Sequence, residues 1–258
     1  MIKAAFFDID GTLVPFGEKE INEKTLTALR KLRENGVKLF ISSGRPLSLI
    51  KNLRGFPFDG YSCDNGADCH VDGKLVYEQP LDQEDAMAIA RITDENNMAV
   101  VAYMEKDMYL NLENERYLEV KALLNIPDLP LRPTAESAKL PVYEYTIYMT
   151  KAEEERLLAP HLGNVIFPRW NPEFADVVSA KVSKGTSMKK LLDIFGLRPE
   201  EAIAFGDGGN DIPMLKTAGI GVAMGNALDF VKAEADFVTG TVNDDGVISA
   251  LEHFGLIR

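Results

Sequence analysis

The chain has 258 residues, of which 46% are hydrophobic and 26% are charged, and its formal net charge is −12. These proportions exclude a disordered or fibrous protein, and the negative charge argues against nucleic acid or anionic lipid as a general partner, because their phosphates would be repelled. No stretch reaches the roughly 18 uncharged apolar residues of a membrane helix and no signal-peptide core opens the chain, so we expect a cytoplasmic protein.

The first segment alternates between strand and helix patterns. Residues 4–7 are an apolar run that ends at Asp8, which predicts a short buried strand. Leucines recur at helical spacing over residues 21–35, and a second apolar run covers residues 37–41. A strand, a helix and another strand in this order predict a right-handed crossover in a parallel sheet.

The middle of the chain has a different pattern. Asn65-Gly66 and Asp72-Gly73 are turn signals, and the second predicts a tight hairpin. Beyond them we expect an α+β module of about a hundred residues, a common domain size, inserted at residues 82–180. Its expected helices lie near residues 84–96, 115–124 and 152–159, and its expected strands at residues 99–104, 108–112, 142–149, 165–167 and 175–179.

Alternating helices and strands return near the end of the chain. Strands are expected at residues 202–205, 219–223 and 236–238, and helices at residues 185–195, 211–216, around 228 and 247–254. Both ends of the chain, residues 1–81 and 181–258, therefore predict one α/β domain with a doubly wound parallel sheet. The two cysteines, Cys63 and Cys69, fit neither a disulfide framework nor a metal-ligand spacing, and we expect ordinary thiols.

Two acidic residues follow the first predicted strand, in Asp8-Ile9-Asp10-Gly11-Thr12-Leu13. Open α/β sheets bind their ligands at the carboxyl ends of strands. Alternation points Asp8 and Asp10 to the same side, where their mutual repulsion favours a bound cation. Mg²⁺ suits such a site because it accepts carboxylate oxygens and leaves room for a substrate phosphate.

Phosphate-binding features follow the second strand and open a later helix. In Ser42-Ser43-Gly44-Arg45-Pro46, a hydroxyl and backbone N–H groups at a glycine turn suit phosphate oxygens, and Arg45 suits an anion. Lys184 begins a helix after the insert and would add positive charge. Each pattern by itself is also typical of an ordinary capping turn or a solvated lysine.

More acidic residues follow a third buried strand, in Gly206-Asp207-Gly208-Gly209-Asn210-Asp211. They are expected at the same edge of the sheet as Asp8, and the glycines let the backbone approach a ligand closely. A calcium loop is the weaker interpretation, because the spacing does not supply the ligand positions of an EF-hand.

With these four motifs in this order, the sequence resembles the haloacid dehalogenase superfamily, and within it the Cof-type phosphatases that carry a large α+β cap of the C2B type. The resemblance implies an Mg²⁺-dependent phosphatase in which Asp8 is the nucleophile and Asp10 the general acid and base. It implies that six residues bind phosphate: Ile9 through its backbone, Ser43, Gly44, Arg45, Lys184 and Asn210. It assigns the metal to Asp8, the Asp10 carbonyl and Asp207, with Asp211 in support.

The resemblance leaves the substrate open, with sugar phosphates favoured over nucleotide or cofactor phosphates. We expect a small phosphorylated metabolite as the partner, and a monomer, since no exposed apolar stripe predicts a dimer. Cap residues should set specificity; Tyr117, Trp170 and Asp176 are conceivable, although aromatic residues are more often core. The alternatives are a phosphomutase of the same fold, a signalling receiver, and a non-catalytic protein that binds metal or phosphate.

Overall fold

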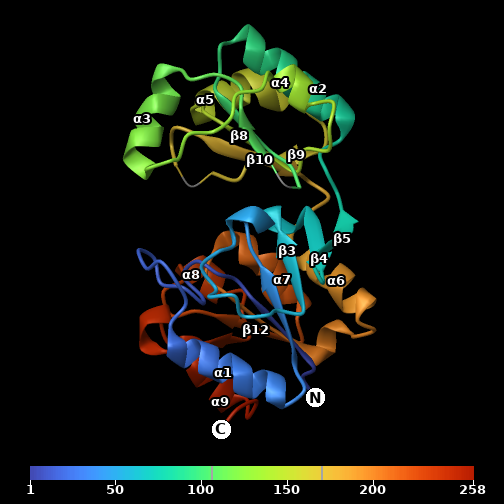
Figure 1. Ribbon diagram of the computed structural model, residues 1–258, viewed down its shortest axis with the longest axis vertical. Helices are drawn as coiled ribbons and strands as arrows, with labels where there is room; N and C mark the ends of the chain where they lie inside the picture. The colour runs from blue at the N-terminus through green and yellow to red at the C-terminus, as the bar shows by residue number, and fades with distance from the viewer. Residues whose placement is uncertain (106, 170) are drawn as a thin grey trace. The chain divides into compact units, whose positions relative to one another are not determined.

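The computed structural model describes residues 1–105, 107–169 and 171–258 (Figure 1). The chain divides into two compact units, and the second is inserted in the first. The first unit comprises residues 1–78 and 182–258, and the second comprises residues 79–181. Trp170 lies outside the described residues, so its conceivable role in specificity stays a prediction.

An eight-stranded sheet forms the centre of the first unit, in the order β13-β12-β11-β1-β2-β3-β4-β5. All neighbours from β13 to β3 pair in parallel, whereas β4 and β5 pair antiparallel at one edge. The strands are β1 (Ala4–Phe7), β2 (Lys38–Ser42), β3 (Gly60–Cys63), β4 (Asp68–Val71), β5 (Lys74–Glu78), β11 (Ala202–Gly206), β12 (Ile220–Ala223) and β13 (Phe237–Val238). The predicted doubly wound α/β sheet is therefore confirmed.

Helices cover both faces of this sheet, because alternate side chains of its buried strands point to opposite sides. Ala5 and Phe7 of β1 pack in one core with leucines of α1 and α9, while Ala4 and Phe6 pack in a second core with α6 and α7. The helices are α1 (Glu23–Glu34), α6 (Lys184–Ile194), α7 (Ile212–Thr217), α8 (Asp229–Lys232) and α9 (Gly246–His253). Burial on both faces explains why β1 and β11 are apolar without alternation.

The helices and strands predicted for this unit are present, with ends that differ by at most two residues. The predicted hairpin is β4 and β5, with Asp72 and Gly73 both at positive φ in its turn. Strand β3 was not predicted, because Gly60-Tyr61-Ser62-Cys63 lacks a continuous apolar run. Cys63 and Cys69 are free and buried, as expected.

The inserted unit has an antiparallel five-stranded sheet in the order β7-β6-β8-β10-β9, which confirms the predicted α+β class of the insert. Its strands are β6 (Val100–Tyr103), β7 (Met108–Leu110), β8 (Glu144–Ile147), β9 (Val165–Ile166) and β10 (Ala175–Ser179). Its helices are α2 (Gln83–Glu95), α3 (Glu115–Leu124), α4 (Thr134–Ser137) and α5 (Lys151–Glu153), and a π-helical turn, Glu154–Leu158, continues α5. Separate apolar clusters on the two faces join the sheet to α2 and to α3.

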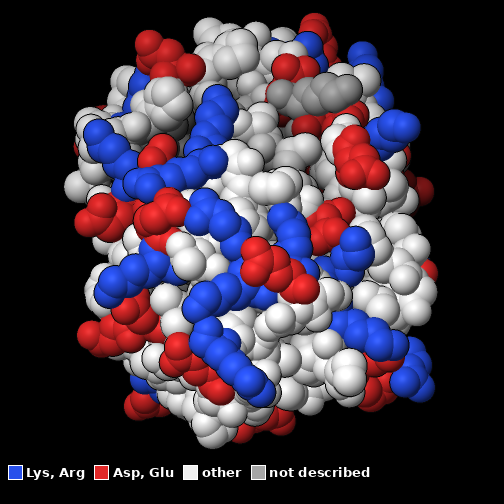
Figure 2. All heavy atoms as spheres, turned by 60° about the horizontal axis from the view of Figure 1, so that its bottom comes forward, with Lys and Arg blue, Asp and Glu red and all other residues white. Residues whose placement is uncertain are grey.

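Basic and acidic side chains are interspersed on the face shown in Figure 2, in spite of the net charge of −12. Several lysines of the first unit pair with nearby carboxylates: Lys3 with Glu201 at 2.7 Å, Lys38 with Asp59 at 2.8 Å and Lys24 with Asp245 at 3.1 Å. Within the described ranges, no helix is long and apolar enough to cross a membrane.

Candidate active site

Strands β1 and β11 bring two acidic loops together at their carboxyl ends. Phe7 lies opposite Phe205 in the parallel register, and the next N–H, that of Asp8, donates to the Phe205 carbonyl at 3.0 Å. The third neighbour, β2, ends beside them and continues into Ser43. The connections diverge to opposite sides of β1, and this switch in strand order is where open α/β sheets bind ligands.

The centre of the site is a buried lysine between two carboxylates. Lys184 Nζ donates to Asp8 Oδ1 and to Asp211 Oδ1, both at 2.6 Å. Lys184 and Asp211 are each 1% exposed, and Asp8 is 7% exposed. Burying charged groups costs free energy unless they are paired. This arrangement therefore indicates that the three groups have a function in the site and are not ordinary solvated surface charges.

Asp207 completes a group of three carboxylates with Asp8 and Asp211. One ligand oxygen from each lies within 4.8 Å of the others. The second Asp211 oxygen accepts the backbone N–H groups of Asp207 (2.9 Å) and Gly208 (2.8 Å), which fixes the loop. Gly206 permits this closeness, since a Cβ there would lie 2.4 Å from Asp211 Cβ. Three carboxylates beside one ammonium group retain negative charge, and hard oxygen ligands of this kind fit Mg²⁺.

Burial shifts the proton affinities of these groups. It raises the pKa of Asp8 to about 8, against the opposing effect of Lys184. Burial and then the neighbouring Asp211 raise the pKa of Asp207 to about 6. Burial by itself would lower the pKa of Lys184, but Asp211 and Asp8 outweigh it and the net shift is upward. Perturbed carboxylates that converge on one point are typical of functional sites.

The carboxylate of Asp10 pairs with Arg45 rather than joining the cluster. Arg45 Nε donates to Asp10 Oδ2 and its Nη2 donates to Oδ1, both at 2.7 Å. The Arg45 backbone N–H donates to Ser43 Oγ at 3.1 Å, so the hydroxyl stabilises the turn of the predicted phosphate loop. Ser43 is 1% exposed, and Ile9 is fully buried with its side chain in the hydrophobic core.

Asn65 is a site residue that the sequence patterns did not identify beyond a turn. Asn210 Nδ2 donates to Asn65 Oδ1 at 2.9 Å, and the Asn65 backbone N–H donates to the Ser43 carbonyl at 3.2 Å. A Cβ at Gly44 would lie 3.2 Å from Asn65 Oδ1. Asn65 therefore links the loop of Ser43 and Gly44 to the loop of Asn210.

Asn226 and Thr12 were also missed as site residues. Asn226 Nδ2 donates to Asp207 Oδ2 and to the Gly11 carbonyl, both at 3.0 Å. Thr12 Oγ1 approaches Asp207 Oδ1 at 3.5 Å. Asn226 lies three residues beyond the end of β12. Because open α/β sheets bind ligands at the carboxyl ends of their strands, this position could have identified Asn226 as a candidate site residue.

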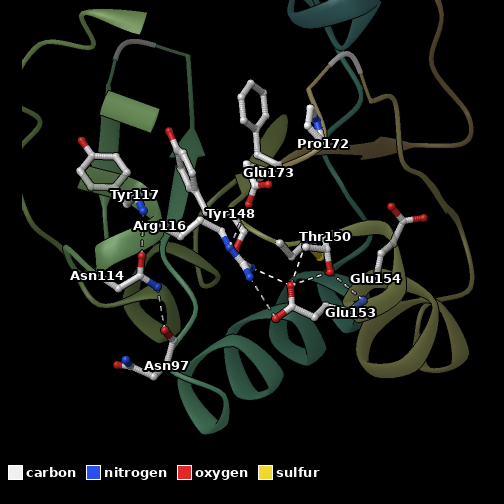
Figure 3. Close-up of polar contacts among 12 residues, drawn as sticks. Asn97, Asn114, Arg116, Tyr117, Tyr148, Thr150, Glu153, Glu154, Pro172 and Glu173 are labelled. Atoms are coloured by element: carbon white, nitrogen blue, oxygen red, sulfur yellow. Dashed lines mark hydrogen bonds and ion pairs between the residues drawn. The ribbon is translucent and has the colours of Figure 1, made fainter. Parts of the chain in front are cut away.

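The inserted unit contains a separate polar pocket of about 270 Å³ (Figure 3). Arg116 lies in its lining, and its Nη1 donates to Glu153 Oε2 at 2.6 Å and to the Tyr148 carbonyl at 3.2 Å. The nearby Tyr117 is fully buried, with its ring edge-on to Tyr148 at 5.0 Å, so it is a core residue. Asp176, the other conceivable specificity residue, accepts a hydrogen bond from Thr146 at 2.8 Å.

Comparison with known proteins places this chain among phosphatases. Residues 5–251 match the model of the haloacid dehalogenase-like hydrolase family. The candidate phosphatase YkrA of Bacillus subtilis is 30% identical over 99% of both chains. YitU of the same organism, a 5-amino-6-(5-phospho-D-ribitylamino)uracil phosphatase, is 29% identical over 96% of both.

Solved structures give the same result. The subclass IIB sugar phosphatase BT4131 superposes with a TM-score of 0.88 at 36% identity, over 99% of this chain and 100% of that one. BT1666 from Bacteroides thetaiotaomicron, studied among phosphatases of this superfamily, superposes with a TM-score of 0.92 at 34% identity, over 100% of this chain and 96% of that one.

Proposed function

This chain belongs to the haloacid dehalogenase-like hydrolase family and is a phosphatase, and from that premise we propose that it hydrolyses small phosphomonoesters through an aspartyl phosphate on Asp8. The observation that carries the proposal is the buried contact of Lys184 Nζ with Asp8 Oδ1 at 2.6 Å. It fixes a carboxylate at the edge of the sheet, next to a positive charge that suits phosphate oxygens.

We propose Mg²⁺ as the cofactor, held by Asp8, Asp207 and the Asp10 carbonyl, with Asp211 in support. The donor set fits, because carboxylates from three positions converge within 4.8 Å and outnumber the single lysine. When bound, the ion supplies positive charge that offsets the negative charge of the substrate phosphate.

In the first step, an Asp8 carboxylate oxygen attacks phosphorus and the bond from phosphorus to the ester oxygen breaks. Lys184 orients that carboxylate, and the Ser43-Gly44 turn and Asn210 bind the equatorial phosphate oxygens. Asp10 gives its proton to the departing oxygen, which leaves as an alcohol. The products of this step are the free alcohol and an aspartyl phosphate.

In the second step, water attacks the aspartyl phosphate and Asp10 takes a proton from it. The bond between phosphorus and the Asp8 oxygen breaks, which releases inorganic phosphate and restores the carboxylate. The division into two displacements replaces one difficult step with two easier ones. Asp10 can serve both steps only if Arg45, which occupies both of its oxygens here, releases at least one of them.

We propose sugar phosphates as the first substrate class to test, because BT4131, a sugar phosphatase, resembles this chain over its full length. The functions of relatives differ, however, since YitU acts on a phosphoribitylamino-uracil. Substrate choice is therefore a separate question from the chemistry. Of the conceivable determinants in the inserted unit, Asp176 and Trp170 stay predictions, whereas Tyr117 is a core residue.

The test compares the natural protein with Asp8→Asn, a variant of nearly the same shape without the attacking carboxylate. We expect Mg²⁺-dependent phosphate release from an aryl phosphate, and a loss of roughly 10³-fold or more in the variant. Acid quenching during turnover should trap labelled phosphate on the natural chain alone. Equal activity of the two proteins would sink the aspartyl-phosphate mechanism, and transfer to a sugar hydroxyl without phosphate release would identify a mutase.

A further inference from the structure

Asn226 lies at the point where the loop that follows β1 meets the loop that follows β11. A Cβ at Gly11 would lie 2.2 Å from Asp207 Oδ2, so the two loops touch there without a side chain between them. Asn226 Nδ2 donates to both sides of this contact, to the Gly11 carbonyl and to Asp207 Oδ2, each at 3.0 Å. One amide group thus joins the loop of the nucleophile to the loop of the metal ligand.

The third hydrogen bond of this amide determines its orientation. Asn226 Oδ1 accepts the backbone N–H of Val242 at 2.9 Å. If the amide were flipped, its oxygen would face two acceptors and its nitrogen would face a donor, so the hydrogen-bond network permits one orientation only. The side chain is exposed on the surface, which means that its bonds, not burial, hold it in place.

Asp207 depends on this donor for its own orientation. Among the described residues, the side-chain hydrogen bonds to its carboxylate come from Asn226 at 3.0 Å and from Thr12 at the longer distance of 3.5 Å. A carboxylate that binds a metal must present one oxygen in a defined direction, and outer partners of such ligands commonly fix that direction. Without Asn226, the side chain of Asp207 would be free to rotate, and binding of the metal would have to restrict that rotation, which lowers the affinity.

We propose that Asn226 is a positioning residue that orients Asp207 against the Gly11 carbonyl and so prepares the metal site before substrate arrives. The inference rests on the proposed function, since it assigns Asp207 as a metal ligand. It adds a residue outside the four motifs that identify the family resemblance. The expected consequence is a specific loss of metal affinity rather than a loss of fold.

The experiment measures Mg²⁺ binding to the substrate-free protein by titration calorimetry, for the natural chain, Asn226→Ala and Asn226→Ser. We expect the Kd for Mg²⁺ to rise about tenfold in both variants. We also expect kcat to return to near the natural value at saturating Mg²⁺, because none of the groups assigned to the reacting phosphate has been changed. Thermal unfolding in chelator checks that the variants are folded.

Asn35→Ala is the matched control, since Asn35 is also exposed and its Nδ2 ties two segments together by donating to the Leu256 carbonyl at 2.7 Å. The substitution Asn35→Ala should leave the Kd for Mg²⁺ unchanged. An unchanged Kd in both Asn226 variants, with Mg²⁺ binding intact in the natural chain, would overturn the inference and leave the proposed function standing. If the natural chain binds no Mg²⁺, the metal assignment fails and the inference with it.

Discussion

Arg45 holds both carboxylate oxygens of Asp10, with Nε 2.7 Å from Oδ2 and Nη2 2.7 Å from Oδ1. The two side chains are 38% and 37% exposed, so solvent competes for the pair. An anion or hydroxyl group on a substrate can therefore draw Arg45 away at little cost. The contact connects the residue assigned to anion binding with the residue assigned to proton transfer.

The variant Arg45→Met should separate the contribution of this ion pair to catalysis from its contribution to stability. Exposed ion pairs contribute at most about 1 kcal/mol to stability, so the urea midpoint should change little. Loss of the guanidinium group should misplace Asp10 and the substrate, and we expect kcat/KM to fall by roughly a hundredfold. Steady-state kinetics and urea unfolding of the same preparations check this. A lower midpoint with unchanged kcat/KM would make the pair structural only.

At pH 9, above the raised pKa of Asp8, Lys184→Met should destabilise the metal-free protein strongly. Its removal leaves the Asp8 and Asp211 carboxylates buried without their cation, and breaking a buried pair costs about 3–5 kcal/mol. Urea unfolding in chelator measures the loss, with Lys189→Met on the exposed face of the same helix as the control. Equal stability of the two variants would mean that the buried carboxylates take up protons instead.

Gly11→Ala and Gly17→Ala form a matched pair that tests the loop contact. Both glycines have positive φ, +84° and +88°, so each alanine should cost about 1–2 kcal/mol of backbone strain. Only the Gly11 substitution places a methyl group against Asp207 Oδ2, because nothing lies within 4 Å of a Cβ at Gly17. We expect weaker Mg²⁺ binding in Gly11→Ala alone. Similar Mg²⁺ affinity in both variants would refute the close contact.

Mg²⁺ binding should strengthen as pH rises. The pKa of Asp207 is raised to about 6 and that of Asp8 to about 8, so at low pH the metal-free carboxylates carry protons that the ion must displace. Calorimetry in two buffers of different ionisation enthalpy should detect proton release at pH 6 and 7, and little at pH 9. An affinity that is the same at pH 6 and pH 9 would contradict the raised values.

The same shifts predict how pH affects the stability of the metal-free protein. Because the folded-state pKa of Asp8 lies above its unfolded value of 3.8, the folded chain binds more protons between these values. The contribution of Asp8 to the free energy of unfolding should therefore decrease as pH rises from about 4 to about 8. Urea unfolding in chelator across this range measures it, and saturating Mg²⁺ should restore stability at the upper end. A contribution that stays constant between pH 5 and pH 8 would show that Asp8 is already ionised throughout this range.

Local patterns in the sequence determined the strands and the edge at which the site lies. The apolar runs before Asp8 and before Asp207 indicate buried strands, and their alternation with helices favours a parallel sheet. In such a sheet the loops that follow neighbouring strands meet at one edge, which is why residues 199 positions apart in the chain could be placed together. The polar residue types in those loops then indicated phosphate and metal chemistry.

Only the tertiary structure decided which side chains pair within that edge. Asn226 lies 215 positions from Gly11 and Asn65 lies 145 from Asn210, and neither residue stands out from an ordinary turn asparagine in sequence. The pairing of Arg45 with Asp10 likewise depends on distances of a few ångströms. The same is true of the contacts of Lys184, which is 1% exposed, with Asp8 and Asp211. Such distances follow from strand order, register and packing, whereas a sequence pattern records only the direction in which a side chain leaves its own strand or helix.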